Sequence, residues 1–264
     1  MSGQIKVDET YGDVHISVAD DYVVTAEIRR PPNNFFDQAM IASLAEAFEA
    51  IDADSACRAI VLKSEGRHFC AGANFASKES PVEGASGRHL YDEAVRLFET
   101  RTPVVAAIQG AAIGGGLGLA LMPDFRVAAP EARFSANFAR LGFHQGFGLS
   151  VTLPRLVGQQ AAAELLMTGR RISGEDALKV GLCDRLVSLD QLGAEAHAFA
   201  AEIAGSAPLA VDSIRETLRG DLAADIRRAT DREKAEQDRL QKTKDFREGT
   251  RAMAERRPPR FEGC

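Results

Sequence analysis

The sequence contains no tryptophan, four cysteines and no block of basic residues. The cysteines have neither Cys-x-x-Cys spacing nor nearby histidine pairs, so we expect no metal site and no disulfide framework, and free thiols in a reducing cytosol. A formal net charge of −6 argues against nucleic acid or an anionic membrane as the main partner. The first ten residues lack a charged segment followed by an apolar one, so we expect no export signal and a cytoplasmic protein.

The chain also lacks an uninterrupted hydrophobic run long enough for a membrane span. Residues 104–122 come closest, since nearly all of them are apolar. However, Gln109 and five glycines interrupt this run, and Asp124 and Arg126 follow it directly. The pattern therefore predicts a buried strand, a turn and a buried helix, and we expect no membrane partner.

What is present is an alternation of strands and helices typical of an α/β protein. Residues 14–18 and 22–29 predict a hairpin, and 37–52 have the apolar spacing of an amphipathic helix. Further strands are predicted at 59–63, 104–108 and 125–128, with helices near 87–99 and at 117–121 between them. This order indicates a mainly parallel sheet, in which ligands bind at the carboxyl ends of the strands.

Two glycine-rich loops follow two of these strands. In the first, Gly114–Gly116 precede a helix, so backbone N–H groups can approach a ligand where the helix dipole is most positive. In the second, residues 68–75 (HFCAGANF) place small residues after the strand at 59–63. Two such loops can each direct one N–H group at the same oxygen, which is how an oxyanion hole is built.

After about residue 158 the pattern predicts helices. Four are expected, at 159–168, 174–179, 189–204 and 207–219. The segment 221–256 is rich in charge, with too few apolar residues for a core of its own. A charge-rich helix is usually a solvated face; the alternative is that it docks on a neighbouring subunit, and we expect a homo-oligomer.

These motifs resemble the enoyl-CoA hydratase/isomerase (crotonase) superfamily over essentially the whole chain. Phe69–Asn74 and Gln109–Gly116 are similar to its two oxyanion motifs, and further similarities occur at 123–128, 132–134, 153–158, 166–170, 177–184 and 248–261. The resemblance implies a spiral of ββα units over 1–200 and a C-terminal helical region, 201–264, for oligomerisation and pocket cover. It also implies a trimer or hexamer that binds acyl-CoA thioesters, with coenzyme A as part of the substrate and no permanently bound cofactor.

The resemblance further assigns site residues. The N–H groups of Ala73 and Gly115 would hold the thioester oxygen, and one such donor is worth about 10²–10³ in rate. Arg67, Arg256 and either Arg29 or Arg30 would lie near the phosphates of coenzyme A, with Ala71 also on the cofactor side. The alternative is that these are ordinary surface arginines.

The sequence departs from the family at its catalytic acids. Hydratases of the family use two glutamates because adding water requires one group to activate it and another to protonate the α-carbon, but here Gly118 and Phe138 stand at those positions. An aspartate used by some isomerases and dehalogenases falls near Gly146. His144 is therefore the candidate general base, unless it is a hydrogen-bonded loop histidine that points away from the pocket.

The remaining site predictions concern the acyl pocket. Gln145 could orient a water molecule, and Phe138 and Phe143, with Gly118, are expected to line the pocket. Cys70, His68 and Tyr91 are more typical of packing and surface residues. Three functions follow: an enzyme that stabilises a thioester enolate for hydrolysis, decarboxylation or isomerisation; a non-catalytic acyl-CoA carrier; and a scaffold, which the glycine triplet argues against.

Overall fold

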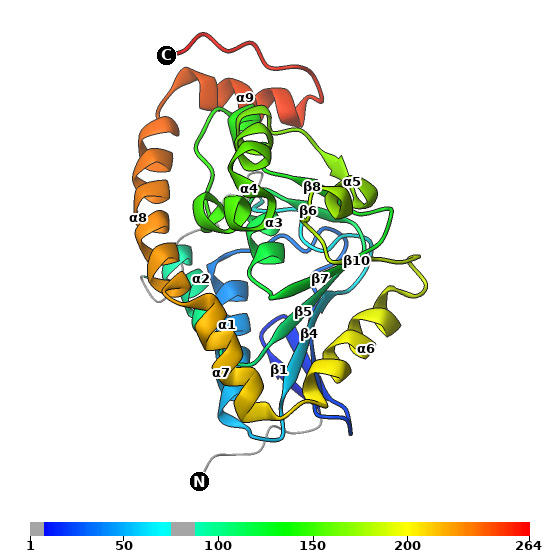
Figure 1. The fold of residues 1–264 in the computed structure, drawn as a ribbon. Helices are drawn as coiled ribbons and strands as arrows, with labels where there is room; N and C mark the ends of the chain where they lie inside the picture. The colour runs from blue at the N-terminus through cyan, green and yellow to red at the C-terminus, as the bar shows by residue number, and fades with distance from the viewer. Residues whose placement is uncertain (1–7, 75–87) are drawn as a thin grey trace.

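The computed structural model describes residues 8–74 and 88–264, and its centre is a seven-stranded sheet (Figure 1). The strand order is β1-β2-β3-β4-β5-β7-β10. Strand β2 is antiparallel to its neighbours β1 and β3, and the rest continue from β3 in parallel. Their bounds are Asp8–Tyr11, Val14–Val18, Val23–Ile28, Ala59–Ser64, Val104–Ile108, Phe125–Ala128 and Arg185–Leu186. The predicted hairpin and the mainly parallel sheet are confirmed.

A second, three-stranded sheet lies at the carboxyl ends of the parallel strands. It consists of β6 (Ala111–Ile113), β8 (Arg133–Ser135) and β9 (Ile172–Ser173), in the order β6-β8-β9. Strand β6 follows β5 directly, and β8 follows β7, so that each pair of strands leads into a helix. The sequence predicted only a loop over 109–116, because three residues are too few to show strand periodicity.

Helices cover both faces of the large sheet. In Figure 1, α1 and α2 lie on one side and α6 on the other. The smaller of two hydrophobic clusters joins Leu192, Ala196 and Ala200 of α6 to the sheet. Both faces of a parallel sheet are normally covered in this way, which explains why the central strand β5 is apolar and buried along its whole length. The helices are α1 (Gln38–Ala53), α2 (Leu90–Glu99), α3 (Gly115–Leu121), the 3₁₀ helix η1 (Asn137–Leu141), α4 (Leu149–Thr168), α5 (Gly174–Lys179), α6 (Leu192–Ala204), α7 (Pro208–Arg219), α8 (Leu222–Leu240) and α9 (Lys244–Ala254).

The structure adds to two helical predictions. The helix expected at 159–168 is the second part of α4, which begins at Leu149 and is interrupted at Gly158, whose φ of +77° is not helical. The charged segment expected at 221–256 is two helices, because Thr243 caps α9 by accepting a hydrogen bond from the Phe246 N–H. Buried positions on α8 include Thr230, Glu233 and Gln237, so its inner face is partly polar.

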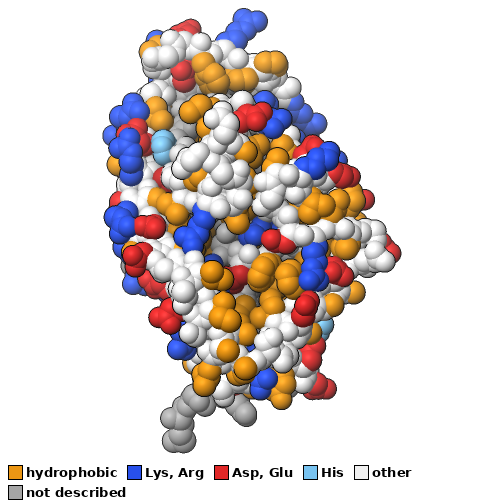
Figure 2. All heavy atoms as spheres, viewed as in Figure 1, with side chains coloured by type: hydrophobic (Ala, Val, Ile, Leu, Met, Phe, Trp, Pro, Cys, Tyr) orange, Lys and Arg blue, Asp and Glu red, His pale blue; other side chains and the backbone are white. Residues whose placement is uncertain are grey.

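The described residues contain no helix long and apolar enough to cross a membrane. On the face of the molecule drawn in Figure 2, positive and negative side chains are interspersed rather than gathered in one patch of a single sign.

Candidate functional site

The two glycine-rich loops lie against each other through their backbones. Cys70 N–H donates to the Ala111 carbonyl (2.9 Å), and Ile113 N–H donates to the Cys70 carbonyl (3.1 Å). A Cβ atom on Gly116 would lie 2.2 Å from the Cys70 carbonyl oxygen, and one on Gly72 would lie 2.8 Å from that of Ile113. Only glycine allows this approach, so the two glycines hold the loops side by side.

The two predicted oxyanion residues, Ala73 and Gly115, line one cavity. Gly114 turns the chain into α3 with φ +58°, while its own N–H donates to the Ser135 carbonyl. The N–H groups at the start of a helix have no partner inside it. Over residues 8–74 and 88–264, neither the Ala73 nor the Gly115 N–H donates to a protein acceptor. Both amides are therefore available to a ligand.

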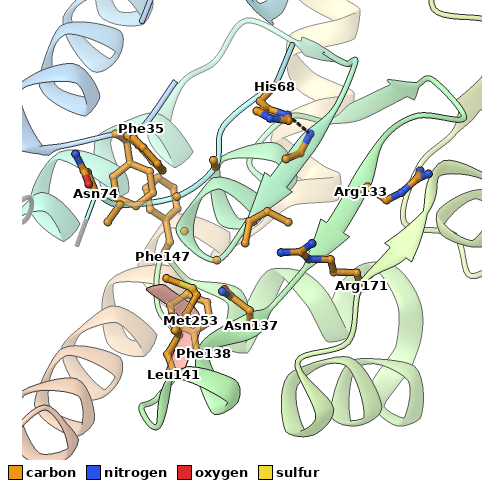
Figure 3. A pocket seen from close by; sticks show the side chains of 18 of the residues that line it. Phe35, His68, Asn74, Arg133, Asn137, Phe138, Leu141, Phe147, Arg171 and Met253 are labelled. Atoms are coloured by element: carbon orange, nitrogen blue, oxygen red, sulfur yellow. Dashed lines mark hydrogen bonds between the residues drawn. The ribbon is translucent and has the colours of Figure 1, made fainter. Parts of the chain in front are cut away.

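The cavity has a volume of about 1330 Å³ and combines apolar walls with basic side chains (Figure 3). Its aromatic and aliphatic lining includes Phe36, Leu90, Phe138, Leu141, Phe143, Phe147 and Met253. Its charged lining is Arg67, Glu131, Arg133, Arg171 and Arg251. Glu131, the one carboxylate among these described lining residues, is exposed. The cavity can thus enclose an apolar group and attract an anion, but its described lining holds no buried carboxylate pair.

Aromatic side chains surround Gly118 and Phe138, the positions at which the resemblance implies the two glutamates of hydratases. Gly118 is buried in α3, and a Cβ atom there would lie 2.6 Å from the Cβ of Phe147. Gly118 itself is not among the cavity-lining residues, contrary to prediction, because Phe147 covers it. Phe138 and Phe143 do line the cavity, with ring centroids 5.4 Å apart. This wall is therefore suited to apolar contact rather than to proton transfer.

The loop that carries Phe147 is held by a chain of buried hydrogen bonds. The Tyr91 hydroxyl donates to Oε1 of Gln237 (2.9 Å), and Nε2 of Gln237 donates to the His144 carbonyl (3.0 Å). Burial raises the pKa of Tyr91, so the phenol stays protonated. A Cβ atom on Gly146 would lie 1.9 Å from the Tyr91 hydroxyl oxygen, which leaves no room for an aspartate there.

Glu233 of α8 holds the other end of this loop. Its side chain accepts hydrogen bonds from the N–H groups of Gly148 (2.8 Å) and Ser150 (3.0 Å), at the start of α4. Glu233 is 1% exposed, and burial raises its pKa. It is not among the residues that line the cavity. It acts as a side-chain cap for α4 from a distant part of the chain.

Replacement of Glu233 by alanine is expected to lower the free energy of unfolding by about 2–4 kcal/mol, because two buried N–H groups would lose their acceptor. Urea denaturation followed by circular dichroism measures this loss. The matched control is Glu236→Ala on the same helix, whose carboxylate pairs with Arg239 at the surface and should cost under about 0.5 kcal/mol. Equal effects of the two substitutions would refute the capping role.

The structure does not place His144 and Gln145 in the cavity. The Nδ1 atom of His144 lies 2.8 Å from the Gln145 carbonyl oxygen, and Nε2 of Gln145 donates to the Ser150 hydroxyl. The prediction of His144 as a base in the pocket therefore gives way to its alternative, a hydrogen-bonded loop histidine. The glycines around it turn the backbone so that Phe143 and Phe147, rather than His144, line the cavity.

His68, by contrast, lines the cavity. Its Nδ1 accepts a hydrogen bond from the Ala111 N–H (3.3 Å), as Figure 3 shows. Burial and the nearby Arg67 lower its pKa, so the neutral imidazole is favoured. With Nδ1 engaged as an acceptor, the remaining proton is on Nε2, and the ring is a donor rather than a free base.

The predicted cofactor-binding residues divide into two groups. Arg67 and Ala71 line the cavity, whereas Arg29 and Arg256 do not. Arg29 pairs with Glu27 (2.8 Å), and Arg256 is exposed. Arg133, Arg171 and Arg251 line the cavity and were not predicted. Arg133 lies in a recognised motif, but nothing in the spacing of the sequence indicated that Arg171 would face the site.

Cys70 belongs to the motif Phe69–Asn74 but is unsuited to nucleophilic chemistry. It is completely buried, and burial raises the pKa of its thiol to about 12. Within the described part of the chain, no group of three or more histidine, cysteine, aspartate or glutamate side chains is arranged to hold a metal ion.

Comparison with known proteins identifies the family. The enoyl-CoA hydratase/isomerase family model matches residues 19–264, so the chain belongs to this family, within the crotonase superfamily. A protein of Bacillus subtilis (strain 168) named "Probable enoyl-CoA hydratase" is 31% identical, with 94% of this chain and 98% of that protein covered. The (E)-benzylidenesuccinyl-CoA hydratase of Thauera aromatica is also 31% identical, with 92% and 97% covered.

Solved structures agree with this assignment. The crystal structure of an enoyl-CoA hydratase/isomerase from Pseudoalteromonas atlantica T6c matches with a TM-score of 0.87 and 30% sequence identity. The match covers 95% of this chain and 100% of that chain. The fold predicted from the resemblance is thus confirmed, and the protein is of the acyl-CoA-processing type.

Proposed function

We propose that this protein binds an acyl-CoA thioester and stabilises negative charge on its carbonyl oxygen, without the proton-transfer chemistry of a standard hydratase. The observation that carries this proposal is the pair of available amides, at Ala73 and Gly115, on two loops in backbone contact. Both amides border a cavity that has apolar walls and arginines at its edge. These are the features that a thioester carbonyl, an acyl chain and an anionic nucleotide require of one site.

The candidate reactions are those in which enolate or oxyanion stabilisation lowers most of the barrier. They are thioester or carbon–carbon bond hydrolysis, decarboxylation, and a double-bond shift in which the substrate carries its own base. Each of these reactions needs fewer catalytic groups from the protein than hydration does, because it does not need two positioned acids. The arginines Arg67, Arg133 and Arg251 would hold the phosphates of coenzyme A.

A specific observation favours a second candidate, a non-catalytic acyl-CoA carrier. The cavity lining includes neither His144 nor a buried carboxylate in the described residues, and the single histidine on it, His68, is a donor. A site that can bind a thioester but not move a proton is suited to holding an acyl group for another protein.

Calorimetry with coenzyme A, butanoyl-CoA and hexanoyl-CoA tests the shared part of both candidates. We expect both thioesters to bind at least about tenfold more tightly than free coenzyme A, because burial of each methylene contributes about 0.8 kcal/mol. Acyl-CoA recognition would be refuted if the three ligands bound with equal affinity, or if none of them bound. Product analysis with a panel of acyl-CoA esters then separates an enzyme from a carrier, since only an enzyme turns over one of them.

A further inference from the structure

Asn137 and Arg171 lie on one wall of the cavity, next to the proposed thioester site. Asn137 opens η1 directly after β8, and Arg171 directly precedes β9, which pairs with β8 through Phe134 and Ile172. A Cβ atom on Gly169 would lie 3.2 Å from the Cα of Asn137, so the two segments touch. Figure 3 shows both side chains projecting from this wall into the cavity.

Neither side chain has a protein partner among the described residues, whereas nearby arginines do. Arg170 pairs with Glu164 (3.1 Å), Arg251 pairs with Glu248, and the guanidinium of Arg133 donates to the Pro130 and Ala132 carbonyls. The hydrogen bonds and ion pairs within 8–74 and 88–264 leave the Arg171 guanidinium and the Asn137 carboxamide free to bind something else. Together they offer several N–H donors and one positive charge.

The wall also has a defined position relative to the oxyanion residues. The side-chain oxygen of Asn137 would lie 3.1 Å from a Cβ atom on Gly114, the neighbour of Gly115. A group that binds Asn137 is therefore close to the acyl carbon that the amides would hold. The cavity lining also includes the aromatic side chains of Phe138 and Phe147.

We propose that Asn137 and Arg171 bind a carboxylate carried by the acyl group, so that the ligands of this protein are CoA thioesters of dicarboxylic acids. A planar guanidinium recognises a carboxylate through two parallel hydrogen bonds, and the carboxamide adds a third donor. Glu131 also lines the cavity; it is exposed, as are Arg133 and Arg171, and the two arginines outnumber it. This inference depends on the proposed acyl-CoA function and specifies its substrate class.

The test compares matched thioesters by calorimetry: succinyl-, glutaryl- and adipoyl-CoA against butanoyl-, pentanoyl- and hexanoyl-CoA, with free coenzyme A as reference. We expect at least one dicarboxylic thioester to bind tenfold or more tightly than its methyl-ended partner. Arg171→Met and Asn137→Leu should each remove most of this preference while leaving the affinity for the methyl-ended thioesters unchanged. Arg171→Lys should retain part of the preference for dicarboxylic thioesters. Asn137→Asp should reverse this preference, because the new carboxylate would repel the carboxylate of the ligand.

The matched control is Arg170→Met, which removes the adjacent arginine and should leave the preference intact, because Arg170 does not line the cavity. The absence of a tenfold preference in all three pairs would overturn the inference. A loss of affinity for every ligand in Arg171→Met, free coenzyme A included, would also overturn it, since Arg171 would then bind the phosphates. If no thioester binds more tightly than coenzyme A, the proposed function itself fails.

Discussion

Hydration of crotonyl-CoA by this protein is expected to be at least about 10⁴-fold slower than by a family member that carries both glutamates. Each positioned acid or base contributes about 10²–10⁴ to the rate of such a reaction, and the resemblance implies that Gly118 and Phe138 stand at the two positions. Glu233 is a buried carboxylate one helical turn from the cavity residue Gln237. Its side chain accepts hydrogen bonds from backbone N–H groups at the start of α4, so it does not act in the cavity. No described side chain in the cavity replaces the pair.

The measurement is the loss of enoyl thioester absorbance, with a two-glutamate relative assayed alongside under the same conditions. Calorimetry on the same preparation confirms that crotonyl-CoA binds, so that a slow rate is not mistaken for an empty site. Hydration at a rate comparable to that of the relative would contradict the prediction, because it would require an acid that residues 8–74 and 88–264 do not place in the cavity.

Restoring the two carboxylates should create hydratase activity only if Phe147 is removed at the same time. A side chain at position 118 would meet the Cβ of Phe147 at 2.6 Å, so Gly118→Glu alone should misfold or displace the loop. Phe147 has φ +61°, where glycine is the most tolerant residue, so Phe147→Gly both opens space and relieves the backbone. The triple variant Gly118→Glu, Phe138→Glu, Phe147→Gly is expected to hydrate crotonyl-CoA about 10²-fold or more faster than the unmodified protein.

Two control variants make this gain interpretable. Phe147→Gly alone should bind thioesters and show no gain, because it supplies space but no acid. Phe138→Glu alone should gain at most a small factor, because one group cannot both activate water and protonate carbon. A triple variant that folds, binds crotonyl-CoA and remains as slow as the unmodified protein would show that some other feature limits the reaction.

The strands were the most predictable part of this fold. The bounds of β5 and β7 agree with the predicted 104–108 and 125–128, because each is a short, mainly apolar run between turn or charged residues. The start of α4 was missed because Pro154 and Gly158 interrupt its apolar spacing. The inner face of α8 was missed because Glu233 and Gln237 are polar, and the packing that buries them comes from segments far away in the chain.

In the candidate site, too, the residues within local motifs were predictable, whereas those positioned by contacts with distant segments were not. Ala73, Gly115, Arg67 and Phe138 were predicted from motifs and line the cavity. The direction of His144 depends on Gln237, which is 93 residues away, and on the turn around Gly146. Arg171 and Asn137 come together only through the pairing of β8 with β9. Motifs therefore located the two glycine-rich loops that line the cavity, while the rest of the lining required the fold.

The infrared carbonyl stretch of a bound thioester tests the central claim most directly, because it reports how strongly the amides at Ala73 and Gly115 polarise the acyl oxygen. Butanoyl-CoA labelled with ¹³C at its carbonyl distinguishes this band from those of the protein. We predict that the band of the bound ligand moves to lower frequency than in water, as two hydrogen bonds in a dry site weaken the double bond. A saturated complex whose carbonyl band stays at its value in water would contradict the account.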